Sequence, residues 1–227
     1  DRPKVLAEVS GRPFIYYLLD QLCETGIKRV ILCTGYMGDY VEEVISKTES
    51  SITFVFSREN NPLGTGGALK NAIGMINTDW ILVLNGDSFV DVNYQDFVSW
   101  HSSKMPKLSI IVASIGIPDR YGVVELNRDQ QIIRFSEKGP VTIKGTAYIN
   151  AGVYLMHRSV IEKLPSKKKI SLENEVFPSL IRAGIFGYVN SGPFIDIGTP
   201  ESFRSAEIFF SERKAKKSTR AILDLGD

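Results

Sequence analysis

The chain has 227 residues and is 43% hydrophobic, enough for one sizeable core or for one core with an appendage. Its 27 Lys and Arg balance 26 Asp and Glu, so the composition gives no reason to expect nucleic acid or a membrane surface as a partner. No apolar run approaches the ~20 residues of a spanning helix, and no secretory signal is visible. Two His and two Cys argue against a Cys/His zinc cluster, and two buried thiols would suit a reducing cytoplasm.

The first half of the chain alternates between two apolar periodicities. Helical spacing predicts helices at 14–25, 37–47 and 65–76, and short apolar runs predict strands at 29–33, 52–56 and 80–84. Pro13 suits a first helical turn, and Gly26 suits a helix C-cap. Strands and helices alternating at these intervals are typical of an α/β protein, so we predict a mostly parallel sheet with helices on both faces.

The second half has a different pattern. We expect helices at 93–104, 172–184 and 200–214, and strands at 108–114, 121–126, 131–135, 147–156, 185–189 and 193–197. Asn93 is a candidate helix cap, and Pro178 is expected to kink its helix. Asn127-Arg128-Asp129 separates two alternating runs and predicts a β-hairpin. The second half therefore adds a small β-rich subregion.

The end of the chain is predicted to be separate from this fold. Residues 1–213 are assigned to one domain, and 214–227 to a tail or to the start of a truncated further segment. The basic residues that begin this stretch indicate a linker. Ala221-Ile222-Leu223 then predicts a new apolar strand.

A glycine-rich stretch, 63–68, follows the turn at 60–62 and opens a predicted helix. Three glycines in four positions cost too much to be explained by helix propensity. They would let a flat ligand approach the backbone and would expose N–H groups at the start of a helix. A tight strand-to-helix turn explains the same residues equally well.

Two aspartates end apolar runs. Asp87 follows the run at 80–84 through Asn85-Gly86, and Asp196 follows Phe194-Ile195. Carboxylates at strand ends lie at the edge of a sheet, where α/β proteins bind ligands. A lone Asp there is more often a turn or helix cap. A converging pair can hold Mg²⁺, which takes few carboxylates together with phosphate oxygens and water.

Three further positions allow two interpretations each. Lys4 suits a phosphate as a mobile charge, but a lysine taken alone is more often a surface residue. Glu137 and Lys138 follow a predicted strand, and the plain alternative is an ion pair on a loop. Asn150 and Gly152 interrupt an apolar strand, which fits either a ligand packed on the backbone or a β-bulge.

Seven motifs in order resemble those of the sugar-1-phosphate nucleotidyltransferases, over residues 2–212. They are Pro3-Lys4 with Leu6, Val9, Gly11 and Pro13; Glu59 with 63–68; Asn85-Gly86-Asp87; 121–124; Glu137-Lys138; 150–154; and 196–200. Within the family, 62–67 and 149–154 are most similar to heptose-1-phosphate guanylyltransferases.

The resemblance implies a Rossmann-like, GT-A-like fold with a β-rich sugar side. It also implies transfer of a nucleotidyl group from an NTP to a sugar 1-phosphate, with release of pyrophosphate. The expected pair is GTP and D-glycero-α-D-manno-heptose 1-phosphate, for surface polysaccharide synthesis. Mannose 1-phosphate guanylyl transfer, or uridylyl or thymidylyl transfer to a hexose 1-phosphate, is the alternative. A homo-oligomer is left open.

The resemblance also implies roles for individual residues. Catalysis falls to Lys4, Asp87 and Asp196, with Mg²⁺ or Mn²⁺ on the two aspartates. The nucleotide side comprises Glu59, Leu63, Gly64, Thr65, Gly66, Asn85 and Gly86. The sugar-phosphate side comprises Tyr121, Gly122, Glu137, Lys138, Asn150 and Gly152.

The chain departs from the family at its start. The family begins with a strand and a loop of the type Gly-Gly-x-Gly-Thr-Arg-Leu, and neither precedes Pro3-Lys4 here. We therefore expect about 15–25 upstream residues beyond the sequence in view. A catalytically silent binding homologue is the alternative of another class. An NAD-dependent dehydrogenase is disfavoured, because no Gly-x-Gly-x-x-Gly follows the first visible strand.

Overall fold

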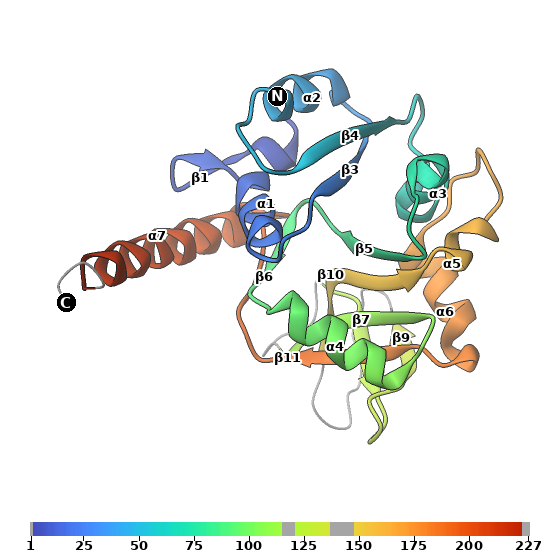
Figure 1. Ribbon diagram of the computed structural model, residues 1–227. Helices are drawn as coiled ribbons and strands as arrows, with labels where there is room; N and C mark the ends of the chain where they lie inside the picture. Colours follow the sequence, from blue (N-terminus) through green and yellow to red (C-terminus); the bar gives the residue numbers. More distant parts are fainter. Residues whose placement is uncertain (1, 115–120, 137–147, 224–227) are drawn as a thin grey trace.

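A computed structural model describes residues 2–114, 121–136 and 148–223, with side chains described as far as Lys214 (Figure 1). Its α-helices are α1 (Ile15–Glu24), α2 (Gly38–Ser46), α3 (Gly64–Ala72), α4 (Tyr94–Lys104), α5 (Ser159–Glu162), α6 (Phe177–Leu180) and α7 (Pro200–Leu223). Shorter helical turns are η1 (Lys4–Leu6), η2 (Ile73–Met75), the π-helical η3 (Leu172–Val176) and η4 (Ile181–Ala183).

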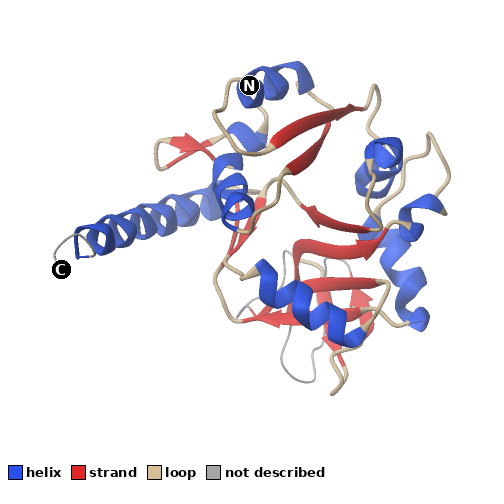
Figure 2. Ribbon diagram, viewed as in Figure 1, coloured by secondary structure: helices blue, strands red, loops and turns tan. Residues whose placement is uncertain are grey.

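The strands alternate with these helices along the chain. They are β1 (Glu8–Val9), β2 (Arg12–Pro13), β3 (Arg29–Thr34), β4 (Thr53–Arg58), β5 (Trp80–Leu84), β6 (Ser88–Val90), β7 (Leu108–Ser114), β8 (Val123–Leu126), β9 (Ile132–Ser136), β10 (Tyr148–His157), β11 (Phe186–Asn190) and β12 (Phe194–Asp196). Figure 2 shows the strands in the middle, with helices around them. The predicted α/β class is confirmed.

The main sheet is mixed, not mostly parallel as predicted. Its order is β11-β7-β10-β8-β9, and β5 also pairs with β10. The ten-residue β10 runs antiparallel to β5, β7 and β8. Among the described pairs, β3 with β4 and β11 with β7 are parallel. Apolar runs show that strands are buried but do not show their direction, so the sequence pattern missed the reversal.

The strands β3 and β5 belong to separate sheets. Within the described residues β3 pairs with β4, and β5 pairs with β10, and no pairing joins the two. The central apolar residues of both strands, such as Ile31 and Leu82, are only half-buried, whereas β7 is buried from Leu108 to Ala113. The chain thus leaves apolar strand surface partly uncovered at this place.

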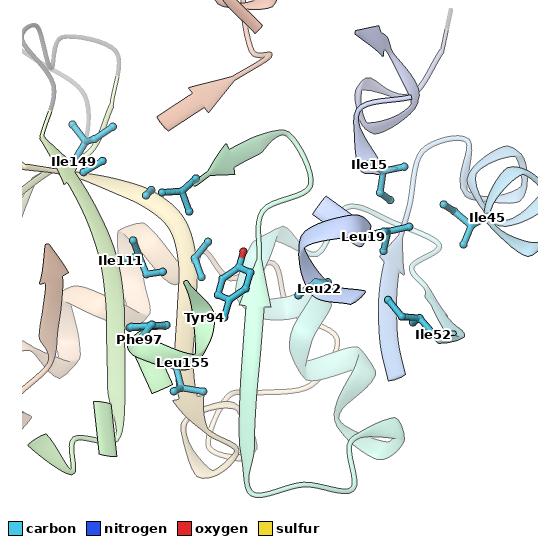
Figure 3. Close-up of a cluster of buried hydrophobic side chains, with 14 of the residues drawn as sticks. Ile15, Leu19, Leu22, Ile45, Ile52, Tyr94, Phe97, Ile111, Ile149 and Leu155 are labelled. Carbon is cyan, nitrogen blue, oxygen red and sulfur yellow. The ribbon is translucent and has the colours of Figure 1, made fainter. Parts of the chain in front are cut away.

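Three clusters of buried apolar side chains hold the elements together. In the first, side chains of α1 and α2 lie on one side and those of α4, β7 and β10 on the other (Figure 3). The second packs β7 and β10 against α6, around Tyr154 and Phe177. The third seats Phe210 of α7 on Phe14 and Phe89. Each fully buried aromatic or aliphatic side chain contributes about 1.5–3 kcal/mol through removal from water.

Two local predictions are confirmed. The Asn93 side chain caps α4 by accepting hydrogen bonds from the N–H groups of Gln95 at 2.9 Å and Asp96 at 3.3 Å. The hairpin forms from β8 and β9, and Asn127 Oδ1 in its turn accepts from the Gln131 N–H at 2.9 Å. Both features depend on contacts within a few residues, which is why the sequence alone predicts them.

Two other predictions differ from the structure. The helix expected at 172–184 is divided into η3, α6 and η4. Pro178 lies in the first turn of α6, where its missing N–H costs no hydrogen bond, and does not kink a continuous helix. The strand expected at 221–223 is also wrong, because α7 continues to Leu223 and extends away from the body (Figure 1). None of the described helices combines the length and apolar character needed to cross a bilayer.

The buried histidine of α4 makes a testable contribution to stability. His101 is 3% exposed, its Nδ1 lies 2.8 Å from Ser109 Oγ, and its Nε2 has no partner among the described residues. Burial lowers the pKa of His101. The unfolded chain therefore takes up a proton near pH 6.5 that the folded chain resists, so stability is full above that pH and falls as the pH drops below it.

Lowering the pH from 7.5 to 5.5 should reduce the free energy of unfolding more in the wild type than in a His101→Gln variant. Urea titrations at the two pH values measure this difference. The difference is at most about 1.4 kcal/mol, because one pKa unit corresponds to 1.36 kcal/mol and pH 5.5 lies about one unit below the ordinary pKa of histidine. A His157→Gln variant is the control, since it keeps the buried His101 ring while changing another residue that contacts Trp80. Equal pH dependence in the wild type and His101→Gln would contradict this assignment.

Candidate functional site

The two predicted metal-binding aspartates lie at the same end of a pair of strands, Asp87 just before β6 and Asp196 at the end of β12. β6 runs antiparallel to β12, and Asp196 is opposite Ser88. The Ile197 N–H donates to the Asp87 carbonyl oxygen at 3.1 Å. The backbone therefore brings Asp87 and Asp196 to neighbouring positions, although they are far apart in the sequence.

The two carboxylates differ in their surroundings. Asp196 Oδ1 accepts from the Gly198 N–H at 2.8 Å and from Ser202 Oγ at 2.9 Å, which places it at the start of α7. Its Oδ2 accepts from the Tyr121 hydroxyl. Asp87 is half-buried, and its carboxylate makes no hydrogen bond or ion pair with the described residues. Asp196 is thus held in place by several described residues, whereas none of them holds the Asp87 carboxylate.

The donor set fits a hard divalent cation that is also bound by a substrate. No group of three or more His, Cys, Asp or Glu gathers at a possible metal position within the described ranges. Mg²⁺ or Mn²⁺ requires only oxygen ligands and takes most of them from phosphates and water. Both Asp87 oxygens and the remaining lone pair of Asp196 Oδ2 meet that requirement.

Lys4 lies in a turn that packs against the loop carrying Asp87. A Cβ atom at Gly86 would come within 2.8 Å of Val5 Cγ1, so the glycine allows η1 to approach the loop closely. The Lys4 side chain is exposed and has no partner among the described residues. The structure therefore places the start of the chain beside Asn85-Gly86-Asp87.

The strand interruption at Asn150 and Gly152 is a β-bulge. The pairing of β10 with β7 shifts register between Asn150 and Tyr154, and Gly152 has a φ of +75°. A Cβ there would lie 2.7 Å from Ser88 Oγ and 2.9 Å from Asn85 Nδ2, and the Asn85 N–H donates to the Gly152 oxygen at 2.8 Å. The β-bulge interpretation is confirmed, and Asn85 occupies the space beside the glycine.

The glycine-rich motif packs against the chain's own backbone. Gly64 has a φ of +70°, and a Cβ on it would lie 2.6 Å from the Ile170 oxygen. That oxygen accepts from the N–H groups of Gly66 at 2.9 Å and Gly67 at 3.3 Å. The N–H groups of Gly66 and Gly67 are therefore bonded within the chain and are not exposed to a ligand. The sequence does not reveal that residues near Ile170, about a hundred positions later, fill this space.

Other predicted nucleotide-side residues shape the same turn. Glu59 Oε2 accepts from the Leu63 N–H at 3.1 Å, and the Leu63 oxygen accepts from the Ile170 N–H at 2.8 Å. Thr65 Oγ1 donates to Glu173 Oε2 at 2.7 Å. Glu59, Leu63 and Thr65 thus stabilise the loop before and at the start of α3.

The described sugar-side residues converge near β10. Tyr121 contacts Asp196 and packs edge-to-face on Phe194, with ring centroids 5.4 Å apart. The Gly122 oxygen accepts from the Asn150 N–H at 3.1 Å. Glu137 and Lys138 lie outside the described residues.

The sequence did not predict a polar network that lies between the nucleotide side and the sugar-phosphate side. Tyr154 Oη donates to Glu173 Oε1 at 3.1 Å and accepts from Asn150 Nδ2 at 2.8 Å, although Tyr154 is 0% exposed. Burial, followed by the negative charge of Glu173, raises the pKa of Tyr154 well above its usual range, so the hydroxyl keeps its proton. The one available signal was a tyrosine in the apolar run of β10, because a buried hydroxyl needs a partner.

Two pockets of the described residues lie elsewhere. One, of about 230 Å³, is formed by α1, α7 and the turn between β1 and β2, and its lining includes Arg12, Gln21 and Phe210. The other lies between α1 and the start of α4. None of the predicted site residues lines either pocket, so the candidate site rests on strand pairing and side-chain contacts.

The chain is similar to several known proteins. A family model described as "Nucleotidyl transferase" matches residues 1–213. The mannose-1-phosphate guanylyltransferase of Mycobacterium tuberculosis is 33% identical over 205 residues, which are 88% of this chain and 56% of that protein. The D-glycero-alpha-D-manno-heptose 1-phosphate guanylyltransferase of Aneurinibacillus thermoaerophilus is 31% identical over 206 residues, which are 90% of this chain and 88% of that protein.

A solved structure is similar over almost the whole chain. HddC from Yersinia pseudotuberculosis, crystallised as a complex with GMP-PN, superposes with a TM-score of 0.81 at 35% identity. The match covers 92% of this chain and 91% of that one. In contrast, the chain spans little more than half the length of the Mycobacterium tuberculosis protein.

Proposed function

Because the chain belongs to the nucleotidyl transferase family, we propose that it transfers a nucleotidyl group from an NTP to a sugar 1-phosphate and releases pyrophosphate. The observation that carries this proposal is the pairing of β6 with β12, which brings Asp87 and Asp196 to neighbouring positions. The turn that holds Lys4 lies beside them. Two carboxylates and a lysine at one sheet edge are what a polyphosphate substrate with its cation requires.

The reaction needs positioning and charge neutralisation more than proton transfer. An oxygen of the sugar 1-phosphate attacks the α-phosphorus in line, and pyrophosphate leaves. The attacking phosphate is ionised at neutral pH, so no strong general base is required. Lys4 offsets negative charge on the phosphates, and Asn85, fixed by the Gly152 oxygen, orients the loop that carries Asp87. A divalent cation held by Asp87 and Asp196 would neutralise phosphate charge.

The proposed donor is GTP, and the first proposed acceptor is D-glycero-α-D-manno-heptose 1-phosphate. Both relatives described above are named guanylyltransferases, which supports the choice of base. The match covers 88% of the heptose enzyme, which supports heptose 1-phosphate as the acceptor. Mannose 1-phosphate is the second candidate, favoured by the 33% identity to the mycobacterial protein. The product would be a GDP-sugar made in the cytoplasm for surface polysaccharides.

Pyrophosphate release by the full-length protein tests this proposal. GTP, ATP, UTP, CTP and dTTP are each combined with heptose, mannose and glucose 1-phosphates in the presence of Mg²⁺. We expect release with GTP and heptose 1-phosphate, and slower release with mannose 1-phosphate. A preference for UTP or dTTP with glucose 1-phosphate would overturn the substrate assignment. No release with any pair would favour a catalytically silent homologue.

A further inference from the structure

The π-helical turn η3 carries a carboxylate that touches two other elements at once. Glu173 Oε2 accepts from Thr65 Oγ1 at 2.7 Å, at the start of α3, and from Ser171 Oγ at 3.0 Å. Glu173 Oε1 accepts from Tyr154 Oη at 3.1 Å, in β10. Each oxygen therefore holds a different part of the candidate site.

Both ends of this contact continue into predicted substrate-binding segments. On one side, Thr65 Oγ1 also accepts from the Leu172 N–H at 2.8 Å, so α3 and η3 are joined twice. On the other side, Tyr154 bonds to Asn150, whose Oδ1 accepts from the Gly152 N–H at 3.0 Å. Gly152 in turn supports Asn85. A continuous series of hydrogen bonds thus connects the nucleotide side to the sugar-phosphate side.

Glu173 lies in an unusual backbone conformation. A π-helical turn is rare and is frequently found at functional sites. Here it carries Glu173 towards the buried Tyr154, which additionally packs edge-to-face on Phe177 at 4.8 Å between ring centroids. The adjacent Glu175 makes only a local contact, in which its Oε1 accepts from the Ser171 N–H at 2.8 Å.

We propose that Glu173 is a positioning residue that couples nucleotide binding at the start of α3 to sugar-phosphate binding beside β10. This inference rests on the function proposed above, because it assigns Thr65 and Asn150 to opposite substrates. Glu173 acts through its hydrogen bonds to Thr65 and Tyr154 and does not itself contact the reacting atoms. When the nucleotide or the sugar phosphate binds, it orders the residues at its end of these hydrogen bonds. The residues at the other end are then held nearer to the geometry that binds the second substrate.

Calorimetry on the full-length protein with Mg²⁺ tests the coupling. The nucleotide probe is guanosine 5′-(α,β-methylene)triphosphate, whose α,β bridge resists cleavage. Its Kd is measured with and without saturating heptose or mannose 1-phosphate, whichever supports faster pyrophosphate release. In the wild type we expect the sugar phosphate to tighten the Kd about 5-fold or more, the lower end of common coupling factors.

Four variants distinguish a loss of coupling from a loss of folding. Tyr154→Phe and Glu173→Ala should reduce the coupling factor to about 1 at temperatures where thermal unfolding shows them folded, because the series is interrupted. Glu173→Gln, which keeps one acceptor oxygen, should fall between Ala and the wild type. Glu175→Gln, in the same turn, is the control and should keep the wild-type factor. A smaller folded fraction changes the number of sites but leaves this factor unchanged.

Failure of this inference and failure of the proposed function give different results. A wild type that releases pyrophosphate but shows no coupling, or a Glu173→Ala variant with the wild-type factor, overturns the role of Glu173 and leaves the proposed function intact. A wild type that releases no pyrophosphate with any substrate pair overturns the proposed function and this inference with it.

Discussion

An Asp87→Asn variant is expected to release pyrophosphate at least ~10²–10³-fold more slowly than the wild type, the usual cost of removing one preorganised charge. The fold should survive, because the Asp87 carboxylate makes no hydrogen bond or ion pair with the described residues. Asparagine keeps the size of the side chain and removes its charge, so the loss reports on the phosphate-bound cation. The rate is measured with saturating GTP and sugar 1-phosphate, beside a thermal unfolding curve.

Asp196→Asn is expected to have an effect of similar size. Its Oδ1 can remain an acceptor for Gly198 and Ser202, so α7 keeps its start. The new amide group would face the Tyr121 hydroxyl, where a carboxylate oxygen now accepts. The variant should therefore lose charge at the site and fold with a modest change in stability.

Asp91→Asn is the matched control for both variants. Asp91 follows β6 directly and pairs with Arg213 at 2.6 Å. It lines the pocket between α1 and the start of α4, which none of the predicted site residues lines. Exposed ion pairs contribute little to stability, and we expect near-normal turnover. Near-normal turnover of Asp87→Asn and Asp196→Asn as well would refute the metal assignment.

A Gly152→Ala variant is expected to lose both stability and activity. Its φ of +75° is strained for alanine, and the added Cβ would meet Ser88 Oγ at 2.7 Å and Asn85 Cβ at 3.0 Å. The backbone strain alone should lower the free energy of unfolding by about 1–3 kcal/mol. Because Asn85 is displaced, the loop that carries Asp87 moves with it. The rate should fall even in the fraction that is folded, as urea titrations and active-site-normalised rates would show.

Gly74→Ala provides the comparison for Gly152. A Cβ at Gly74 meets nothing within 4 Å, and its φ is not positive. This substitution should leave the rate unchanged and stabilise the protein slightly, by about 0.4–1 kcal/mol, through the unfolded chain. Equal behaviour of the two variants would show that the bulge does not position Asn85.

The sequence by itself determined the features that depend on neighbouring residues. The apolar spacing determined where most helices and strands lie, because each periodicity matches one local backbone geometry. Asn93, Gly26 and the turn at Asn127 act within a few residues of their own positions. The ordered motifs were sufficient to identify the family, since they lie in one chain in a fixed order.

Only the tertiary structure decided which distant segments meet. The antiparallel course of β10, the contact of Ile170 with the glycine-rich turn and the reach of Glu173 from Thr65 to Tyr154 all join residues far apart in the chain. The convergence of Asp87 and Asp196 was expected from their strand ends, but the pairing of β6 with β12 is what brings it about. Such contacts depend on sheet register and on packing against remote elements, and a local pattern carries no record of either.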